Sequence, residues 1–276
     1  MANDEGMTVI VQQGVAVAEA HWGHSVHVEV EELEPDRPYW YRFTRGSEVS
    51  PVGRTKTAPA VGSTPDRFRF AYASCQRWDQ GLYTAYRDLA QQDLDLVVHL
   101  GDYIYELGIG LGDQLRPGDY SGHVLSTPTT LEDYRNRYAL YKLDPYLQEA
   151  HRVAPWLVTW EDHEVDNNYF GEIIRDPPMV HALLELRPAA YQAYYEHQPL
   201  RKEARPNGLD LQLYRHRSFG NLVEFNVLDT RRPPAGTCWH SRSRSPGSTT
   251  RRTRRWRASA AGRWTSGTAT PTSATR

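Results

Sequence analysis

The chain has 276 residues, enough for one large domain or two ordinary ones with a buried core, and its net charge is −2. This average hides a division, because residues 1–230 carry 21 basic and 34 acidic side chains, a net charge of −13, whereas residues 231–276 carry +11. The acidic body argues against binding to a nucleic-acid backbone and is compatible with binding of divalent or trivalent cations.

Several classes of protein are excluded by motifs and by the distribution of apolar residues. No apolar run approaches the roughly 18 residues of a membrane span. The N-terminus, MANDEGMTVIVQQG, has no basic region ahead of an apolar stretch, so we expect no export signal in this chain. Two cysteines do not make a disulfide framework, and no phosphate-binding loop or serine nucleophile elbow is found.

Residues 1–60 predict part of a β-sandwich of the immunoglobulin or fibronectin type. Residues 26–30 alternate valine with polar side chains, and residues 39–45 alternate again after a turn. About three strands are expected here, where such a sandwich has roughly seven. We therefore expect a partial N-terminal β-sandwich domain that begins upstream of Met1.

Residues 61–230 follow a different pattern, in which strands and helices alternate as in a layered α/β domain. A linker at 61–66 precedes it. Thr130 and Asp133 resemble a capping box. In chain order we expect a strand at 67–74, a helix at 81–93, a buried strand at 94–100, a loop at 108–113, a helix from 130 to about 146, a buried strand at 155–160, a helix at 187–197 and a hairpin at 211–229.

Residues 231–276 contain no Leu, Ile, Val, Met, Phe or Tyr, and 27 of the 46 residues are Arg, Ser or Thr. Such a segment cannot bury a core, so we expect it to be disordered. Two origins are open: a basic nucleic-acid-binding tail, or the product of a shifted reading frame. The abrupt change after Asp229-Thr-Arg favours a frameshift.

Polar clusters follow three of the expected strands, at the edge of an α/β sheet where ligands bind. They are Ser74-Cys75-Gln76, then Gly101 to Glu106, and then Glu161 to Glu164 with the following Asp166-Asn167-Asn168. Carboxylate and amide oxygens bind Ca²⁺, Mg²⁺ or Mn²⁺, and a phenolate with a thiolate favours trivalent iron. Two such metal ions can clamp a phosphate and activate a water.

Each of these residues also has an ordinary structural explanation. Cys75 could be a small buried hydrophobe, Asp102 a turn or cap, and Tyr105 part of the core. Asp162-His163-Glu164 could be a solvated loop. The joint occurrence at three strand ends favours the metal site.

Six segments in one order resemble the alkaline phosphatase D (PhoD-like) family of metallophosphatases, over roughly residues 15–231. Ser50–Ala60 resembles the end of that family's N-terminal β-domain. The six segments are FAYASCQ (70–76), DLVVHLGDYIYE (95–106), LEDYRNRYALYKLDPYLQEAH (131–151), WEDHEVDNNY (160–169), AAYQAYYEHQPLR (189–201) and LYRHRSFGNLVEFNVLDTR (213–231).

The resemblance implies a four-layer metallophosphatase fold, two packed sheets flanked by helices, and a pair of metal ions. It implies Fe³⁺ and Ca²⁺, with another divalent metal as the alternative. Glu161 stands where the family usually has aspartate. The implied roles are Asp102 as the bridging ligand, Cys75 and Tyr105 as iron ligands, Asp162 as the ligand of the second metal, Asn167 as a further ligand on the calcium side, and His163 as the catalytic imidazole.

The resemblance further implies hydrolysis of phosphate mono- or diesters by a secreted or extracytoplasmic enzyme, with no nucleic-acid partner. The family's late Gly-Asp-x-His ligand motif is not found in this sequence. The alternative hypothesis is therefore an inactive remnant of such an enzyme, which we favour for the polypeptide as written. A nucleic-acid binder with a basic tail ranks third.

Overall fold

The computed structural model describes residues 1–109, 114–116, 124–170 and 180–232. The tail for which the sequence predicts disorder lies outside the described residues, except for Arg231 and Arg232. Most of the loop expected at 108–113 is also outside them. The described residues belong to one compact unit.

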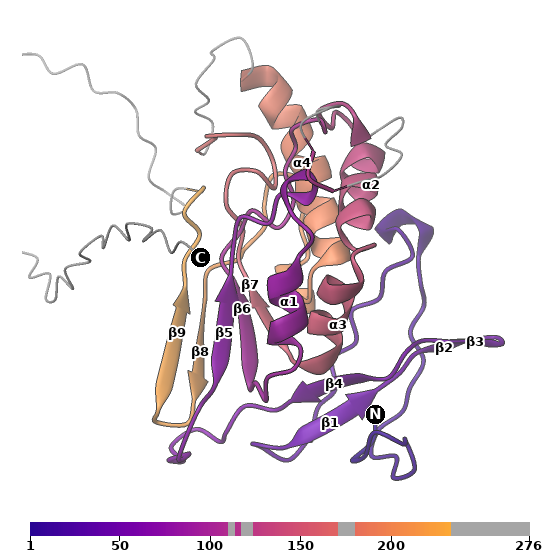
Figure 1. Ribbon diagram of the computed structural model, residues 1–276, viewed down its shortest axis with the longest axis vertical. Coiled ribbons are helices and arrows are strands. Elements are labelled where there is room, and N and C mark those ends of the chain that lie inside the picture. The colour runs from indigo at the N-terminus through magenta and orange to yellow at the C-terminus, as the bar shows by residue number, and fades with distance from the viewer. Residues whose placement is uncertain (110–113, 117–123, 171–179, 233–276) are drawn as a thin grey trace, which may run out of the picture. The chain divides into compact units, whose positions relative to one another are not determined.

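A three-stranded parallel sheet lies at the centre of this unit (Figure 1). Its strands are β5 (Phe70–Ala73), β6 (Leu96–His99) and β7 (Trp156–Val158), in the order β5-β6-β7. All four residues of β6 and all three of β7 are buried, as the unbroken apolar runs predict. The three predicted strands are confirmed, and because they run parallel their carboxyl ends meet at one edge.

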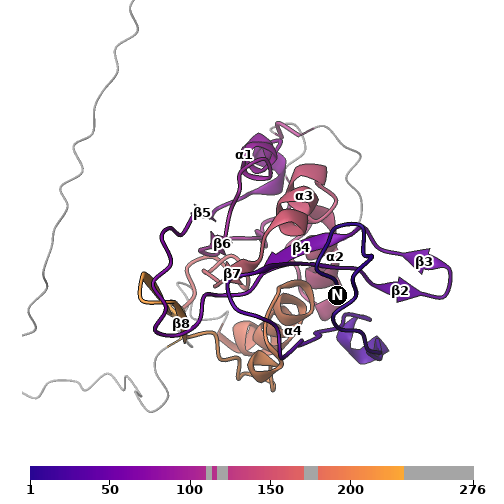
Figure 2. The ribbon, with the colours of Figure 1, turned by 90° about the horizontal axis from the view of Figure 1, so that it is seen from below.

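Helices cover one face of this sheet, as Figures 1 and 2 show from two directions. They are α1 (Thr84–Leu89), α2 (Leu131–Tyr141), α3 (Pro145–Val153) and α4 (Val180–His197). The core beneath them is rich in aromatic rings, and its fully buried tyrosines include Tyr103, Tyr134, Tyr138, Tyr169, Tyr191 and Tyr194. None of the helices within the described ranges is both long and apolar enough to cross a bilayer.

The predicted single helix from residue 130 to about 146 is wrong, because the structure has two helices there. The capping box at its start is confirmed, with Thr130 and Asp133 each bonding the other's backbone N–H. The helix cannot continue through Pro145, which has no N–H for the carbonyl of Tyr141 and disfavours the helical region for Asp144. Asp144 then caps α3, accepting hydrogen bonds from the N–H groups of Tyr146 and Leu147 at 2.8 and 2.9 Å.

The predicted hairpin is confirmed and lies on the opposite face of the sheet (Figure 1). It consists of β8 (Arg215–Phe219) and β9 (Val223–Val227). Its apolar side chains pack against β6 and β7 in a second, smaller core made of Leu96, Val98 and Leu157 with Phe68, Phe219, Phe225 and Val227. The described body thus has three layers: hairpin, parallel sheet and helices.

The N-terminal residues form two short antiparallel pairs, β1 (Pro38–Tyr41) with β4 (Gly53–Lys56) and β2 (Thr44–Arg45) with β3 (Glu48–Val49). The strand expected at 26–30 is wrong, since that segment is not in a strand. It contacts the end of α4 through side chains instead. His27 stacks on Tyr195 with ring centroids 4.0 Å apart, and its Nδ1 lies 2.8 Å from the carbonyl of Leu200.

Three short 3-10 helices complete the described elements: η1 (Ala20–Trp22), η2 (Trp78–Gln80) and η5 (Lys202–Ala204). The N-terminal strands are joined to the α/β body by Lys56, which forms an ion pair with Asp95 at 2.6 Å. Arg54 adds a hydrogen bond to the carbonyl of Val153 at 3.0 Å. These bonds hold β4 against the body near the amino ends of β6 and β7, away from the carboxyl ends of the parallel strands.

The ends of the three parallel strands are held together by backbone hydrogen bonds. The N–H of Cys75 donates to the carbonyl of Gly101 at 3.2 Å, and the N–H of Gln76 donates to that of Asp102 at 3.1 Å. Gly101 has a φ of +108°, and a Cβ there would lie 2.4 Å from the backbone nitrogen of Glu161. Only glycine permits this close approach of the β6 and β7 ends.

Glu164 links the segments that follow β6 and β7, and its side chain is completely buried. Its Oε2 accepts hydrogen bonds from the N–H groups of Asp102 at 3.0 Å and Glu161 at 2.8 Å. Its Oε1 accepts a third from the N–H of Tyr103 at 2.6 Å. One buried carboxylate thus satisfies three backbone donors that the bend of the chain leaves without ladder partners.

We expect Gly101→Ala to lower the free energy of unfolding by about 3 kcal/mol, because it adds both steric overlap and left-handed backbone strain. Gly62→Ala is the matched control, since Gly62 has a φ of +83° but no atom within 4 Å of the added Cβ. That control should lose only about 1 kcal/mol. Urea unfolding of both variants measures the difference, and equal losses would contradict the close-approach argument.

We expect Glu164→Gln to lower the free energy of unfolding by about 1–3 kcal/mol, the cost of a buried donor left without an acceptor. Burial raises the pKa of Glu164 to about 8, so the comparison is made above about pH 9, where the side chain is a carboxylate. The amide has one acceptor oxygen and cannot serve all three N–H groups. Glu149→Gln, which removes a partly exposed ion pair with Arg152, is the control and should cost at most about 1 kcal/mol. Thermal and urea unfolding would show whether the two variants differ.

Candidate metal centre

The first group of predicted site residues meets where β5 and β6 end. The Cys75 thiol lies 3.3 Å from Asp102 Oδ2, and the Tyr105 hydroxyl donates to the same oxygen at 3.2 Å. Cys75 and Asp102 both have left-handed backbones, with φ of 57° and 55°. Such conformations are strained for residues other than glycine, and here they turn both side chains onto one point. The structure therefore brings the Cys75, Asp102 and Tyr105 side chains together, as expected from the strand ends.

Burial raises the pKa of Asp102 above its usual value. Partial burial and the neighbouring Asp102 carboxylate also raise the pKa of the Cys75 thiol and, more strongly, that of the Tyr105 phenol. All three groups are therefore held in their protonated forms more readily than in water. A cation at their meeting point would reverse this preference, because it stabilises the thiolate, phenolate and carboxylate.

The second group comes from the loop after β7. Ligand atoms of Asp102, Asp162 and His163 all lie within 4.8 Å of one another. Asp162 is held by two backbone donors, the N–H of His163 to Oδ1 at 3.0 Å and the N–H of Asn168 to Oδ2 at 2.5 Å. These bonds leave carboxylate lone pairs free, so Asp162 can still bind a cation.

Glu106 is a residue of this centre to which the sequence analysis gives no role. It is buried, and its Oε2 lies 2.6 Å from Nδ1 of His163. The His163 ring also stacks on Tyr105, with centroids 4.1 Å apart. Burial opposes the imidazolium, but the bond to Glu106 and the nearby carboxylates outweigh it and raise the pKa of His163 above its usual value. In the sequence, the position of this carboxylate four residues after Asp102 is the signal that could have identified it.

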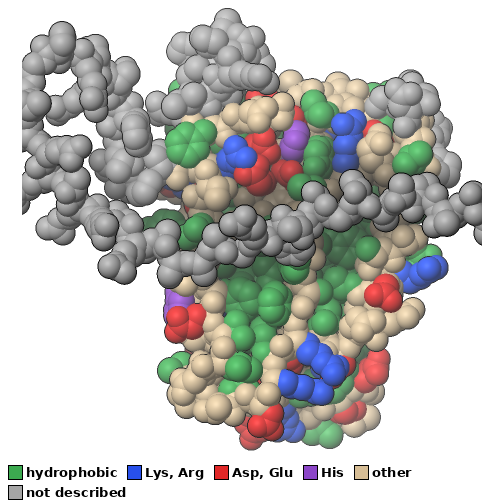
Figure 3. Space-filling model, turned by 60° about the vertical axis from the view of Figure 1, so that its left-hand side comes forward, with side chains coloured by type: hydrophobic (Ala, Val, Ile, Leu, Met, Phe, Trp, Pro, Cys, Tyr) green, Lys and Arg blue, Asp and Glu red, His purple; other side chains and the backbone are tan. Residues whose placement is uncertain are grey.

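Asn167, a further predicted ligand, lies in the same loop after β7. Its side chain is exposed, and its backbone N–H donates to Glu106 Oε1 at 3.2 Å. Arg231, which the sequence analysis assigns to the tail, belongs instead to the described body and forms an ion pair with Glu161. In Figure 3, acidic side chains, a histidine and cationic side chains gather at the end of the molecule towards which the parallel strands run.

The donor atoms fit a cation. Asp102 Oδ1 is buried and has no hydrogen-bond partner among the described residues. Such an orphaned oxygen is costly unless a cation or water satisfies it. Beside it stand a thiol, a phenol and a second carboxylate, which combine one soft ligand with several hard ones, a set suited to iron next to an oxygen-binding metal.

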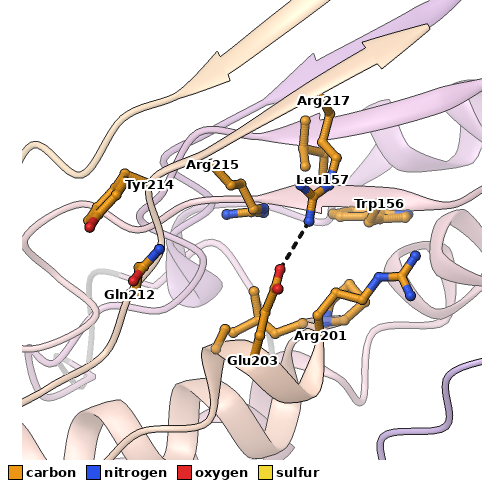
Figure 4. A pocket seen from close by; sticks show the side chains of 11 residues that line it. Trp156, Leu157, Arg201, Glu203, Gln212, Tyr214, Arg215 and Arg217 are labelled. Atoms are coloured by element: carbon orange, nitrogen blue, oxygen red, sulfur yellow. Dashed lines mark hydrogen bonds and ion pairs between the residues drawn. The ribbon is translucent and has the colours of Figure 1, made fainter. Parts of the chain in front are cut away.

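A cavity of about 480 Å³ beside β7 contains none of the predicted site residues. Its lining side chains include Trp156, Leu157, Arg201, Glu203, Arg215 and Arg217 (Figure 4). Two of its lining arginines are engaged by other groups: Arg217 with Glu203 at 3.3 Å, and Arg215 with the carbonyls of Leu213 and Val158 at 2.7 and 2.5 Å. The strand-end cluster is therefore the better candidate for the functional site.

Comparison with known proteins gives consistent matches along the chain. Residues 70–255 match the family model of the PhoD-like phosphatase, and residues 1–59 match that of the PhoD-like phosphatase N-terminal domain. Alkaline phosphatase D of Bacillus subtilis (strain 168) is 52% identical over 231 residues, which are 84% of this chain and 40% of that protein.

A solved structure described as "Structure of PhoD" matches with a TM-score of 0.79 and 51% sequence identity, over 83% of this chain and 44% of that one. The chain thus spans less than half the length of these two relatives. The agreement of family models, sequence identity and fold leaves one assignment: the chain belongs to the PhoD-like phosphatase family.

Proposed function

We propose that the chain carries a metal centre for hydrolysis of phosphate mono- or diesters, as a metal-dependent phosphatase of the alkaline phosphatase D type. The convergence of Cys75, Tyr105 and Asp162 on Asp102, whose buried Oδ1 has no partner in the described part of the chain, is the observation that carries the proposal. Its cations would be Fe³⁺ and Ca²⁺, and Asp102 would be a ligand of both. When bound, they supply Lewis acidity toward the phosphate and its attacking water.

The donor chemistry supports this division of ligands. Cys75 and Tyr105 would bind the iron, because thiolate and phenolate favour a trivalent ion over Ca²⁺. Asp162 and Asn167 would bind the second ion through oxygen, as Ca²⁺ requires. Asp102 lies close to both groups of side chains, so it would contribute to the binding of both cations.

His163 acts on the leaving group. Glu106 holds Nδ1 and fixes the orientation of the ring, which leaves Nε2 for the substrate. The carboxylates around the ring favour its protonated form, so it can donate a proton to the departing alkoxide or phenoxide oxygen. Glu106 is a positioning residue in this scheme, since it acts through His163.

The hairpin on the second face of the parallel sheet supports a four-layer arrangement, in which it belongs to a second sheet. Residues 1–60 would be part of an immunoglobulin-like β-domain, and the family resemblance supports an extracytoplasmic location.

Loading the chain with Fe³⁺ should produce a visible absorption band, because a phenolate bound to ferric iron transfers charge to the metal. Tyr105→Phe should remove this phenolate band, and Cys75→Ser should remove the separate absorption of the thiolate bound to iron. Tyr72→Phe is the matched control, since Tyr72 is 72% exposed on β5 and has no role in the centre. A band of full strength in Tyr105→Phe would contradict the assignment of the iron ligand.

Rates of ester hydrolysis test the role of His163. His163→Ala should lower kcat for phenyl phosphate by about 10²-fold or more, the usual contribution of a general acid. The loss should be smaller for p-nitrophenyl phosphate, whose leaving group needs less protonation. Glu106→Gln should show the same dependence on leaving group with a smaller loss.

The control for that series is His216→Ala, which removes a half-exposed histidine on β8 and should leave both rates unchanged. Equal losses of kcat for the two esters in His163→Ala would contradict proton donation. Absence of turnover by both the metal-loaded chain and its Asp102→Asn variant would favour the inactive remnant.

A further inference from the structure

The segment after β9 is fastened to the end of β7, next to the second group of ligands. Thr159 donates to the carbonyl of Leu228 at 3.0 Å. Asp229 Oδ1 accepts from the indole N–H of Trp160 at 2.9 Å and from the backbone N–H of Arg231 at 3.1 Å. These bonds fix the backbone of Arg231 beside the carboxyl end of β7, whatever the conformation of its side chain.

The Arg231 side chain is held by Glu161. Its Nε donates to Glu161 Oε1 at 2.6 Å, and its Nη2 contacts both oxygens of the same carboxylate. Its Nη1 donates to the carbonyl of Tyr169 at 3.2 Å. Such a bidentate, charge-assisted pair is the strong form of an arginine–carboxylate contact. Both side chains are less than one-third exposed, so solvent screens the pair only partly.

A second carboxylate stands within reach of the same guanidinium. Arg231 Nη2 lies 4.0 Å from Asp162 Oδ1, too far for a hydrogen bond and close enough for one after a small rotation. Glu161 Oε2 also accepts the backbone N–H of Asp162 at 3.0 Å. Glu161 thus contacts both the guanidinium and the backbone of the residue that must bind the second cation.

We propose that Glu161 is a positioning residue that sequesters the Arg231 guanidinium and so keeps the Asp162 carboxylate available to the second cation. This inference rests on the proposed function of the centre. Without the Glu161 carboxylate, Arg231 remains anchored by Asp229 and Tyr169, and Asp162 becomes its partner. A guanidinium on Asp162 competes directly with a cation for the same lone pairs.

The charges predict opposite signs for the two single substitutions. The wild-type pair is neutral, Glu161→Gln leaves one positive charge beside the centre, and Arg231→Gln leaves one negative charge. Glu161→Gln should therefore weaken cation binding, whereas Arg231→Gln should not weaken it. The double variant is neutral again and has no guanidinium to occupy Asp162, so it should restore binding.

The experiment is calorimetric titration of the metal-free chain with Ca²⁺, and separately with Mn²⁺. We expect Glu161→Gln to bind Ca²⁺ about tenfold more weakly or worse, equivalent to about 1.4 kcal/mol. The double variant should return to within about threefold of wild type. Arg232→Gln is the matched control, since that arginine pairs with Asp210 and should leave Ca²⁺ affinity unchanged.

The outcomes separate this inference from the proposed function. If wild type binds neither cation, the proposed metal centre is wrong and the inference falls with it. If wild type binds but Glu161→Gln binds equally well, or the double variant binds as weakly as Glu161→Gln, the inference alone is wrong. Circular dichroism monitors folding of each variant. Should Glu161→Gln not fold, weaker binding by Arg231→Gln than by wild type would overturn the inference and undiminished binding would support it.

Discussion

The candidate centre depends on how closely the ends of β6 and β7 approach each other. Gly101 allows that approach because it has no Cβ, and the buried Glu164 carboxylate holds it by accepting three backbone N–H groups. Asp102 and Asp162 carry like charges, so repulsion between the two carboxylates would move them apart if the loops were free to spread. The glycine contact and the shared acceptor prevent that spreading, so they determine whether both carboxylates can face one pair of cations.

Much of this arrangement could be predicted from sequence because each step has a local cause. The buried runs at 94–100 and 155–160 specify strands covered on both faces, and alternation of strands with helices makes them parallel. Parallel strands end at one edge, so Cys75, Asp102 and Asp162 had to meet there. The capping box at Thr130 and the hairpin at 211–229 were likewise local patterns.

The parts that could not be predicted depend on contacts between distant segments. Residues 26–30 alternate like a strand, yet the segment is fixed by His27 and Tyr195, 168 positions apart in the sequence, so no strand forms. The break after Tyr141, by contrast, has a local cause and could have been predicted, since Asp144-Pro145 is a cap followed by proline. The roles of Glu106 and Arg231 could not be predicted, because only the folded sheet brings their partners, His163 and Glu161, next to them.

The unsatisfied oxygen of Asp102 also links occupancy of the centre to the persistence of the fold. In the cation-free chain, a buried carboxylate oxygen and a neighbouring like charge oppose folding, and the strained backbones at Cys75 and Asp102 add to that opposition. A cation that binds the folded chain and not the unfolded one relieves this cost, stabilising it by about 2.7 kcal/mol at a concentration one hundred times its dissociation constant. Cation supply would then set the lifetime of the folded chain as well as its chemistry, so that a chain deprived of metal is cleared by proteolysis sooner than one that is loaded.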